Sequence, residues 1–238
     1  GIRAFLRPFD GAIDFSAGWG NIARYNVIKC FFNGIGAGIW DKLYDEAYNG
    51  DVDAYGNDIE DTNDDSWEPE GTCMNTRFFK NRISKVFHPI SLAPITIGPS
   101  YVIYNTFDGF SGGSGAYKLN VAPPDDPNKV LDGYIYIYHN TAYTENPDNN
   151  AFSIYEGVPY SRIKFRNNVF RAPRYAIENT GTVLPADFDM DYDLLYHTTS
   201  ASAPNLIKWK DVRYATLADW QKSGAGQEAH GMSAEPLF

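Results

Sequence analysis

The sequence predicts an all-β protein built as a parallel β-solenoid of about seven coils. Three observations lead to this fold class. A short residue frame recurs along the 238 residues, and its repeats follow one another at a nearly constant interval. The segments around the frame are rich in β-branched and aromatic residues and show almost no helical periodicity. A helical repeat of similar length would need amphipathic segments rich in Leu and Ala, which the chain lacks.

The frame is an apolar residue, two residues of any kind, Asn, any residue, and a second apolar residue. Successive frames lie 31, 24, 24, 35, 28 and 25 residues apart, which indicates a base period of 24 or 25. Polar insertions rich in Pro, Asn and Asp at 41–50, 121–132 and 144–150 account for the three longer intervals. The matches are Ala23–Asn26–Ile28, Ala54–Asn57–Ile59, Phe78–Asn81–Ile83, Val102–Asn105–Phe107, Ile137–Asn140–Ala142, Phe165–Asn168–Phe170 and, with Asp in place of Asn, Met190–Asp193–Leu195.

Stacking of the coils would place these Asn residues in one column at a bend of the chain. An Asn side chain there satisfies the backbone groups that the turn leaves open, and its amide bonds to the Asn above and below. We therefore expect the column to be structural rather than catalytic.

The two ends of the chain differ. Residues 214–226 predict a short helix, with Thr216 as N-cap, Leu217 and Trp220 on one side and glycines after it. This helix, with residues 236–238, would cap the solenoid, and residues 1–238 would form a single domain. The first frame lies so early that we expect either further N-terminal coils or a partner to cover the other end.

Composition excludes several classes of protein. Twenty Lys and Arg against 30 Asp and Glu give a net charge of −10, and no run of basic residues occurs, so nucleic acid is not the expected partner. No apolar run approaches the ~18 residues of a membrane-spanning helix.

Three segments carry a resemblance to a known family: 56–71, the stretch from Ile90 through 98–102, and the tail 214–230 with its terminal Pro-Leu-Phe. From about Ile22 onward the chain resembles bacterial right-handed parallel β-helix proteins of the pectate-lyase-like superfamily. That resemblance implies a right-handed coil, a polysaccharide or oligosaccharide substrate as partner, and a secreted or periplasmic location. The superfamily contains polysaccharide lyases, glycoside hydrolases, pectin esterases, phage tailspikes and adhesins, so the resemblance implies a fold more than a reaction.

Acidic residues are concentrated in one coil. Residues 51–70 carry nine carboxylates and no Lys or Arg, so nearly all of the excess charge lies there. A solvated acidic loop is the ordinary interpretation of such a run. However, Val52, Tyr55, Ile59 and Trp67 are spaced to keep the coil inside the solenoid, and crowded carboxylates require a raised pKa or a bound cation. We therefore predict a functional cluster here.

Register within this coil indicates a candidate acid–base pair. Asp64 follows its frame Asn by seven residues and so does His88 one coil later, which predicts that they stack ~4.8 Å apart. Asp65 and Glu68 supply the second carboxylate that glycoside hydrolysis needs. A hydrogen-bonded pair without a catalytic role remains the alternative.

The order of an Asp pair followed by a His resembles polygalacturonase-like hydrolases, and that resemblance implies catalytic roles for Asp64, Asp65 and His88. Two departures weaken it. The His of that family lies between glycines, whereas here it lies between Phe87 and Pro89. The only counterpart of its Arg-x-Lys element is 162–164, three coils further on.

A polysaccharide lyase would use the same coil differently. Glu60 and Asp61, with the later Asp pair, could bind Ca²⁺, while an Arg or Lys of the next coil removes a proton from a uronate. Lys85 falls at the same offset as Asp61, which a surface ion pair also explains. The residues expected to contact substrate are Trp67, Glu70, Arg77 and Arg82.

The leading hypothesis is therefore a glycoside hydrolase-like, polysaccharide-degrading enzyme with catalytic Asp64, Asp65, Glu68 and His88. A Ca²⁺-dependent lyase and a non-catalytic glycan-binding or adhesin-like β-helix are the alternatives.

Overall fold

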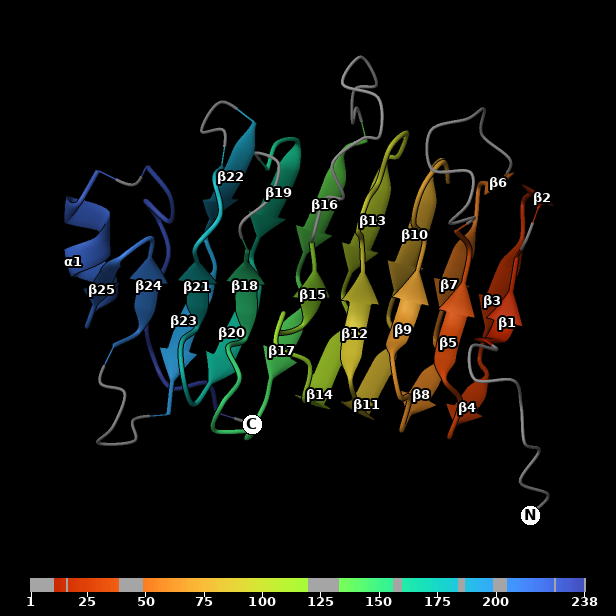
Figure 1. Ribbon diagram of the computed structural model, residues 1–238, viewed down its shortest axis with the longest axis horizontal. Helices are drawn as coiled ribbons and strands as arrows, with labels where there is room; N and C mark the ends of the chain where they lie inside the picture. The colour runs from red at the N-terminus through yellow and green to blue at the C-terminus, as the bar shows by residue number, and fades with distance from the viewer. Residues whose placement is uncertain are drawn as a thin grey trace.

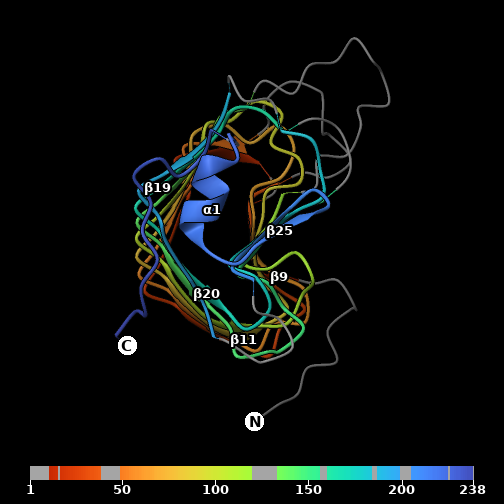
Figure 2. The same cartoon turned by 90° about the vertical axis from the view of Figure 1, so that its left-hand side faces the viewer.

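The computed structural model describes residues 11–15, 17–38, 49–119, 133–155, 160–183, 187–198, 205–224 and 226–237. The chain is a right-handed parallel β-helix in which successive coils stack along one axis (Figure 1). Viewed along that axis, the coils superpose and the single described helix covers the C-terminal end (Figure 2). Of the three expected insertions, 121–132 and most of 41–50 lie outside the described residues.

Two seven-stranded parallel sheets form two sides of the coil. The first sheet contains β3 (Ile22–Arg24), β7 (Asp53–Tyr55), β10 (Thr76–Phe79), β13 (Ser100–Ile103), β16 (Ile135–Tyr138), β19 (Ile163–Arg166) and β22 (Phe188–Asp191). The second sheet contains β4 (Val27–Lys29), β8 (Asp58–Glu60), β11 (Arg82–Val86), β14 (Thr106–Phe110), β17 (Thr141–Tyr143), β20 (Val169–Ala172) and β23 (Leu194–His197). Seven strands in each sheet agree with the seven frames of the sequence.

The remaining side of the coil is shared by two sheets, which run along the front of Figure 1. The third sheet contains β1 (Gly11–Asp14), β5 (Asn33–Gly36), β9 (Asp65–Glu68), β12 (His88–Ser91) and β15 (Tyr117–Lys118). The fourth contains β18 (Phe152–Ile154), β21 (Ile177–Asn179), β24 (Ile207–Trp209) and β25 (Val212–Tyr214), and a two-stranded sheet pairs β2 (Gly18–Trp19) with β6 (Asn49–Gly50).

The core consists of inward-facing side chains that stack from coil to coil. In the first sheet Phe78 lies opposite Val102, Val102 opposite Ile137, and Ile137 opposite Phe165. All four are fully buried, whereas their neighbours along each strand are partly exposed. Alternation with period two therefore fills one continuous apolar interior.

The Asn column forms as predicted, at the bend between the first and second sheets. The backbone N–H and the Nδ2 of Asn81 both donate to Oδ1 of Asn105, at 2.9 and 3.1 Å, and Nδ2 also donates to the carbonyl of Ala54. The same three bonds recur at Asn57, Asn105, Asn140 and Asn168. Each amide thus closes its own turn and joins it to the next coil, which confirms the structural role.

The column ends in two carboxyl groups. Asn168 donates to Oδ1 of Asp193, and the backbone N–H of Asp193 donates to Oε2 of Glu228 at 3.1 Å. Glu228 therefore occupies the next position of the column, although no frame surrounds it in the sequence. It comes from the segment after the helix, whose backbone pairs with Met190 and Asp193.

The C-terminal cap is shorter than expected. Helix α1 spans Leu217–Lys222 rather than 214–226, because Tyr214 belongs to β25, which pairs antiparallel with β24. Thr216 is the N-cap and accepts a hydrogen bond from the Asp219 N–H. Trp220 is fully buried over the last coil. The tail does not join the cap as expected, since Leu237 is 97% exposed; Phe238 lies outside the described residues.

Candidate functional site

The acidic coil does not form one cluster, because its strands belong to three sheets. Asp53 and Asp58 lie on the first and second sheets and form ion pairs with Arg77 and Arg82. Only the last four carboxylates reach the third sheet, and these are Asp64, Asp65, Glu68 and Glu70. The carboxylates of residues 51–70 are thus divided among three sheets, and only the last four remain a candidate site.

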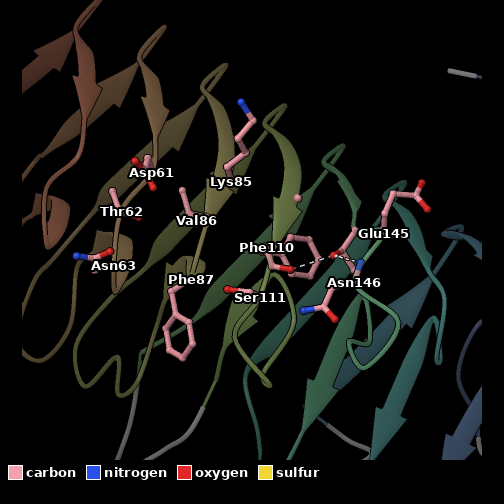
Figure 3. Close-up of a pocket in the computed structure, with 12 residues that line it drawn as sticks. Asp61, Thr62, Asn63, Lys85, Val86, Phe87, Phe110, Ser111, Glu145 and Asn146 are labelled. Carbon is pink, nitrogen blue, oxygen red and sulfur yellow. Dashed lines mark hydrogen bonds between the residues drawn. The ribbon is translucent and has the colours of Figure 1, made fainter.

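A groove lies at the corner between the second and third sheets, where the chain enters the candidate site (Figure 3). It has a volume of about 470 Å³ and crosses successive coils. We call it the corner groove; its lining residues are Asp61, Thr62, Asn63, Lys85, Val86, Phe87, Gly109, Phe110, Ser111, Thr144, Glu145 and Asn146.

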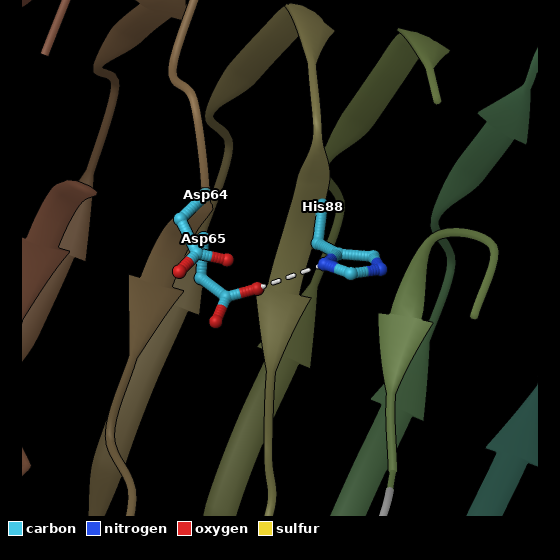
Figure 4. A group of neighbouring side chains, drawn as sticks. All are labelled: Asp64, Asp65 and His88. Carbon is cyan, nitrogen blue, oxygen red and sulfur yellow. Dashed lines mark ion pairs between the residues drawn. The ribbon is translucent and has the colours of Figure 1, made fainter. Parts of the chain in front are cut away.

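His88 lies opposite Asp65 and not, as expected, directly opposite Asp64. The reason is one extra residue at the corner: five positions separate Glu60 from Asp65, but four separate Ser84 from His88, although Glu60 and Ser84 are in register. The His88 Nδ1 lies 3.3 Å from Oδ1 of Asp65 (Figure 4). Asp64 remains close, since its carbonyl accepts the His88 N–H and its carboxylate lies within 4.8 Å of the pair.

Asp65 is a buried anion that lies between Lys118 and His88. Its side chain has no exposed surface, and its Oδ2 accepts a hydrogen bond from Nζ of Lys118 at 2.9 Å. Burial alone would raise the pKa of Asp65, but His88 and Lys118 outweigh it and hold the pKa below its ordinary value. Asp65 is therefore ionised, and it anchors His88 and Lys118 rather than reaching solvent.

The ring of His88 is fixed on its other side by the next coil. A Cβ built on Gly112 would lie 2.1 Å from its Nε2, so only glycine allows the ring to occupy this position. The imidazole is consequently held between the Asp65 carboxylate and the Gly112 backbone, and only 7% of the residue is exposed.

Glu68 and Glu70 project from the same face as Lys118 and remain partly exposed. Burial, followed by repulsion from Asp65 and Glu70, raises the pKa of Glu68 to about 9, and its Oε2 accepts a hydrogen bond from Asn33 at 2.6 Å. Burial also raises the pKa of Glu70, to about 7, while a hydrogen bond from Ser91 and the charge of Lys118 oppose the rise. At neutral pH Glu68 is therefore protonated, and Glu70 is divided between its two forms.

Glu60 and Asp61 do not fit a calcium site. The Glu60 carboxylate already binds Lys29 and Lys85, at 2.5 and 2.8 Å, and these bonds lower its pKa to about 2. Asp61 accepts a hydrogen bond from the Cys30 thiol and faces the corner groove. Lys85 thus pairs with Glu60 and not with Asp61, as its offset had suggested. The carboxylates that do converge are Asp65, Glu68 and Glu70, whose oxygens lie within 4.8 Å of one another.

Three of the four residues expected to contact substrate lie elsewhere. Trp67 is fully buried and stacks on Phe78 with ring centroids 5.1 Å apart, because it shares the inward face of β9. Arg77 and Arg82 are on the first and second sheets, paired with acidic residues of adjacent coils. Only Glu70 joins the site.

The sequence interpretation missed Lys118, which supplies the only ammonium bound to Asp65 among the described residues. Lys118 lies opposite Ser91, which is 27 residues earlier in the chain. The 24-residue period therefore does not locate it. Asn33 and Ser91 were also missed, because short polar residues on a strand carry no distinguishing pattern.

No helix in the described part of the chain is long and apolar enough to cross a membrane. Comparison of the chain with protein-family models, with curated proteins and with solved structures finds no match, so the fold and the side-chain geometry above are what the functional argument rests on.

Proposed function

We propose that the protein is a polysaccharide-degrading enzyme of the pectate-lyase-like superfamily that hydrolyses glycosidic bonds at the third sheet. The observation that carries this proposal is the pair Glu68 and Glu70, two partly exposed carboxyl groups beside the buried, ionised Asp65. Burial, followed by repulsion from Asp65 and Glu70, raises the pKa of Glu68 to about 9, and burial raises that of Glu70 to about 7, so Glu68 holds a proton while Glu70 is partly ionised. Glycoside hydrolysis requires such a pair, with one protonated and one ionised member.

In this proposal Glu68 is the general acid and Glu70 the nucleophile. Glu68 gives its proton to the glycosidic oxygen, the bond from that oxygen to the anomeric carbon breaks, and the Glu70 carboxylate bonds to that carbon. Water then attacks the glycosyl-enzyme, gives its proton to ionised Glu68 and releases the sugar and Glu70. An oxygen of each carboxyl group lies within 4.8 Å of an oxygen of the other, and a nucleophilic Glu70 gives a covalent intermediate and two displacements at the anomeric carbon. Retention of anomeric configuration is therefore expected.

Asp65, His88 and Lys118 are positioning residues in this scheme. Burial, and after it the Asp65 charge, keeps Glu68 protonated, and Lys118 lowers the pKa of Glu70 against the effect of burial. Asp64 lies at the edge of the site, and burial raises its pKa. The hydrolase hypothesis of the sequence is kept, with the acid at Glu68 and with Glu70 in place of the Asp pair.

A Ca²⁺-dependent lyase is the second candidate, and the convergence of Asp65, Glu68 and Glu70 favours it. These three carboxylates offer the oxygen ligands that Ca²⁺ prefers. Against it, the Lys118 ammonium already binds Asp65. A non-catalytic glycan-binding role would use the same face without needing the acid pair. The location we propose is secreted or periplasmic, as the resemblance implies.

A polysaccharide panel assayed with and without calcium separates these candidates. Hydrolysis releases reducing ends, forms no ultraviolet-absorbing product and survives a chelator, whereas elimination forms an unsaturated uronate and stops with a chelator. Glu68→Gln should abolish hydrolysis, and Glu60→Gln, which removes a lysine-bound carboxylate on another sheet, is the matched control. Cleavage that persists in Glu68→Gln, or products of inverted configuration, would contradict the assignment.

A further inference from the structure

Phe87 is the exposed aromatic side chain of the corner groove lining, since Phe110 is buried. Its residue is 41% exposed, and on the neighbouring coils the groove presents the short polar side chains of Asn63 and Ser111 (Figure 3). The ring contact that the structure gives it is with His88, edge-on, with centroids 4.4 Å apart. An apolar ring flanked by an amide and a hydroxyl one coil away on either side matches a sugar, whose C–H face is apolar and whose edge carries hydroxyl groups.

The groove adjoins the end of the candidate site that contains Asp64 and His88. Asn63, Phe87 and Ser111 each immediately precede a residue of that site, namely Asp64, His88 and Gly112. Adjacent coils rise by ~4.8 Å, so a chain of sugars bound along the groove would lie parallel to the solenoid axis. Glu68 follows Asn63 by five residues, ~16 Å along an extended strand, so a substrate held in the groove must extend along β9 to reach Glu68.

Charge in the groove selects between classes of glycan. Its lining carries the carboxylates of Asp61 and Glu145 and the ammonium of Lys85. Lys85 is bonded to Glu60, outside the groove lining, so it is not available to pair with an acidic sugar. Glu145 is likewise paired, with Arg171. A uronate would therefore meet the Asp61 carboxylate and no unpaired cation in the groove lining, whereas a neutral sugar meets no repulsion.

We infer that the corner groove is a subsite for a neutral glycan, with one sugar ring stacked on Phe87 between Asn63 and Ser111. This inference rests on the proposed function, because it names the substrate class of the same site. It also favours hydrolysis over elimination, since elimination needs a uronate.

Titration calorimetry of the full chain tests the inference with cellohexaose, xylohexaose and mannohexaose as neutral probes and hexagalacturonate as the acidic probe. At least one neutral probe should bind, and hexagalacturonate should bind at least 10-fold more weakly. Phe87→Ala and Phe87→Leu should each weaken binding of the neutral probe on the order of 10-fold, as the loss of one aromatic stacking contact predicts, while Phe87→Tyr should retain it. Tyr104→Ala, which removes an exposed ring outside the groove, is the matched control and should bind normally.

Three results would overturn the inference: no binding of any neutral probe, equal or tighter binding of hexagalacturonate, or unchanged binding by Phe87→Ala. Repeating the titrations in the Glu68→Gln background separates this inference from the proposed function. Binding that depends on Phe87 without cleavage of any probe would defeat the hydrolase proposal alone. Cleavage that depends on Glu68, with binding indifferent to Phe87, would defeat the subsite alone.

Discussion

Replacing Glu228 by glutamine tests how the Asn column ends. In every Asn pair of the column, Nδ2 of one residue donates to Oδ1 of the next, as in the bond of Asn140 to Asn168 at 3.1 Å. Asp193 has an oxygen where the other members have that nitrogen, and it faces the carboxyl group of Glu228. Two acceptors cannot bond without a proton between them. Burial and the neighbouring Asp193 accordingly raise the pKa of Glu228 to about 10, and burial raises that of Asp193 to about 6.

The sign of the effect follows from proton linkage. The pKa of Glu228 is about 10 in the folded protein against 4.5 ordinarily, so between these values the folded state holds a proton that the unfolded state releases. The free energy of unfolding therefore falls as pH rises through this window. Holding the proton from pH 4.5 to pH 7 costs about 3 kcal/mol, at ~1.4 kcal/mol per pH unit. Glutamine does not titrate, and its Nε2 can donate to Asp193 in place of the shared proton.

The expected result is that Glu228→Gln matches the wild type near pH 4.5 and exceeds its free energy of unfolding by about 3 kcal/mol at pH 7. Chemical denaturation at several pH values, followed by circular dichroism and by the fluorescence of the nearby cap tryptophan Trp220, measures both proteins. Glu235→Gln, the same change at an exposed position, is the control and should show no such difference. A stability difference that does not change with pH would refute the shared-proton argument.

Three further predictions concern the column, the site and the core. Asn105→Ala removes an amide that bonds to three neighbours, and it leaves buried backbone groups unpaired. Thermal denaturation should therefore show that the free energy of unfolding falls by at least about 3 kcal/mol. A fall of less than about 1 kcal/mol would contradict the structural role. Lys118→Met leaves the buried Asp65 charge uncompensated and should cost about 3–5 kcal/mol by denaturant titration, with Asp65→Asn in the same chain restoring most of it; no rescue would show that the pair does not act as one unit. Trp67→Ala should cost about 3–5 kcal/mol through the cavity it leaves against Phe78, whereas a tryptophan that binds sugar at the surface would weaken binding and leave stability unchanged.

Much of the fold was predictable because the information that specifies it is local and repeated. The frame around Asn81 or Asn105 contains both the buried apolar residues and the amide that closes the turn. About six residues therefore specify the bend of each coil. The role of Glu228 was not predicted, because Glu228 completes the Asn column from a segment that lacks the frame. Its position depends on how the chain returns over the last coil after α1.

The candidate site was predictable only in part. The concentration of acid in residues 51–70 indicated the coil that carries Asp65, Glu68 and Glu70, and the proximity of an Asp to His88 followed from the period. The choice of Asp65 over Asp64 did not follow, because a single extra corner residue shifts the register by one position. In a strand, one position also exchanges the inward and outward faces, which is why Trp67 is core while Glu68 is at the surface.

By itself, then, the sequence determined the repeating coil, the amide column and the coil in which acidic groups gather, since periodic spacing alone implies which positions stack. Only the tertiary structure decided that Lys118 meets Asp65, that Arg77 and Arg82 belong to other faces, and that Glu228 faces Asp193. The contacts of Lys118 with Asp65 and of Glu228 with Asp193 join segments separated by loops of unequal length. The path of such loops is set by packing on the finished solenoid and not by any local pattern.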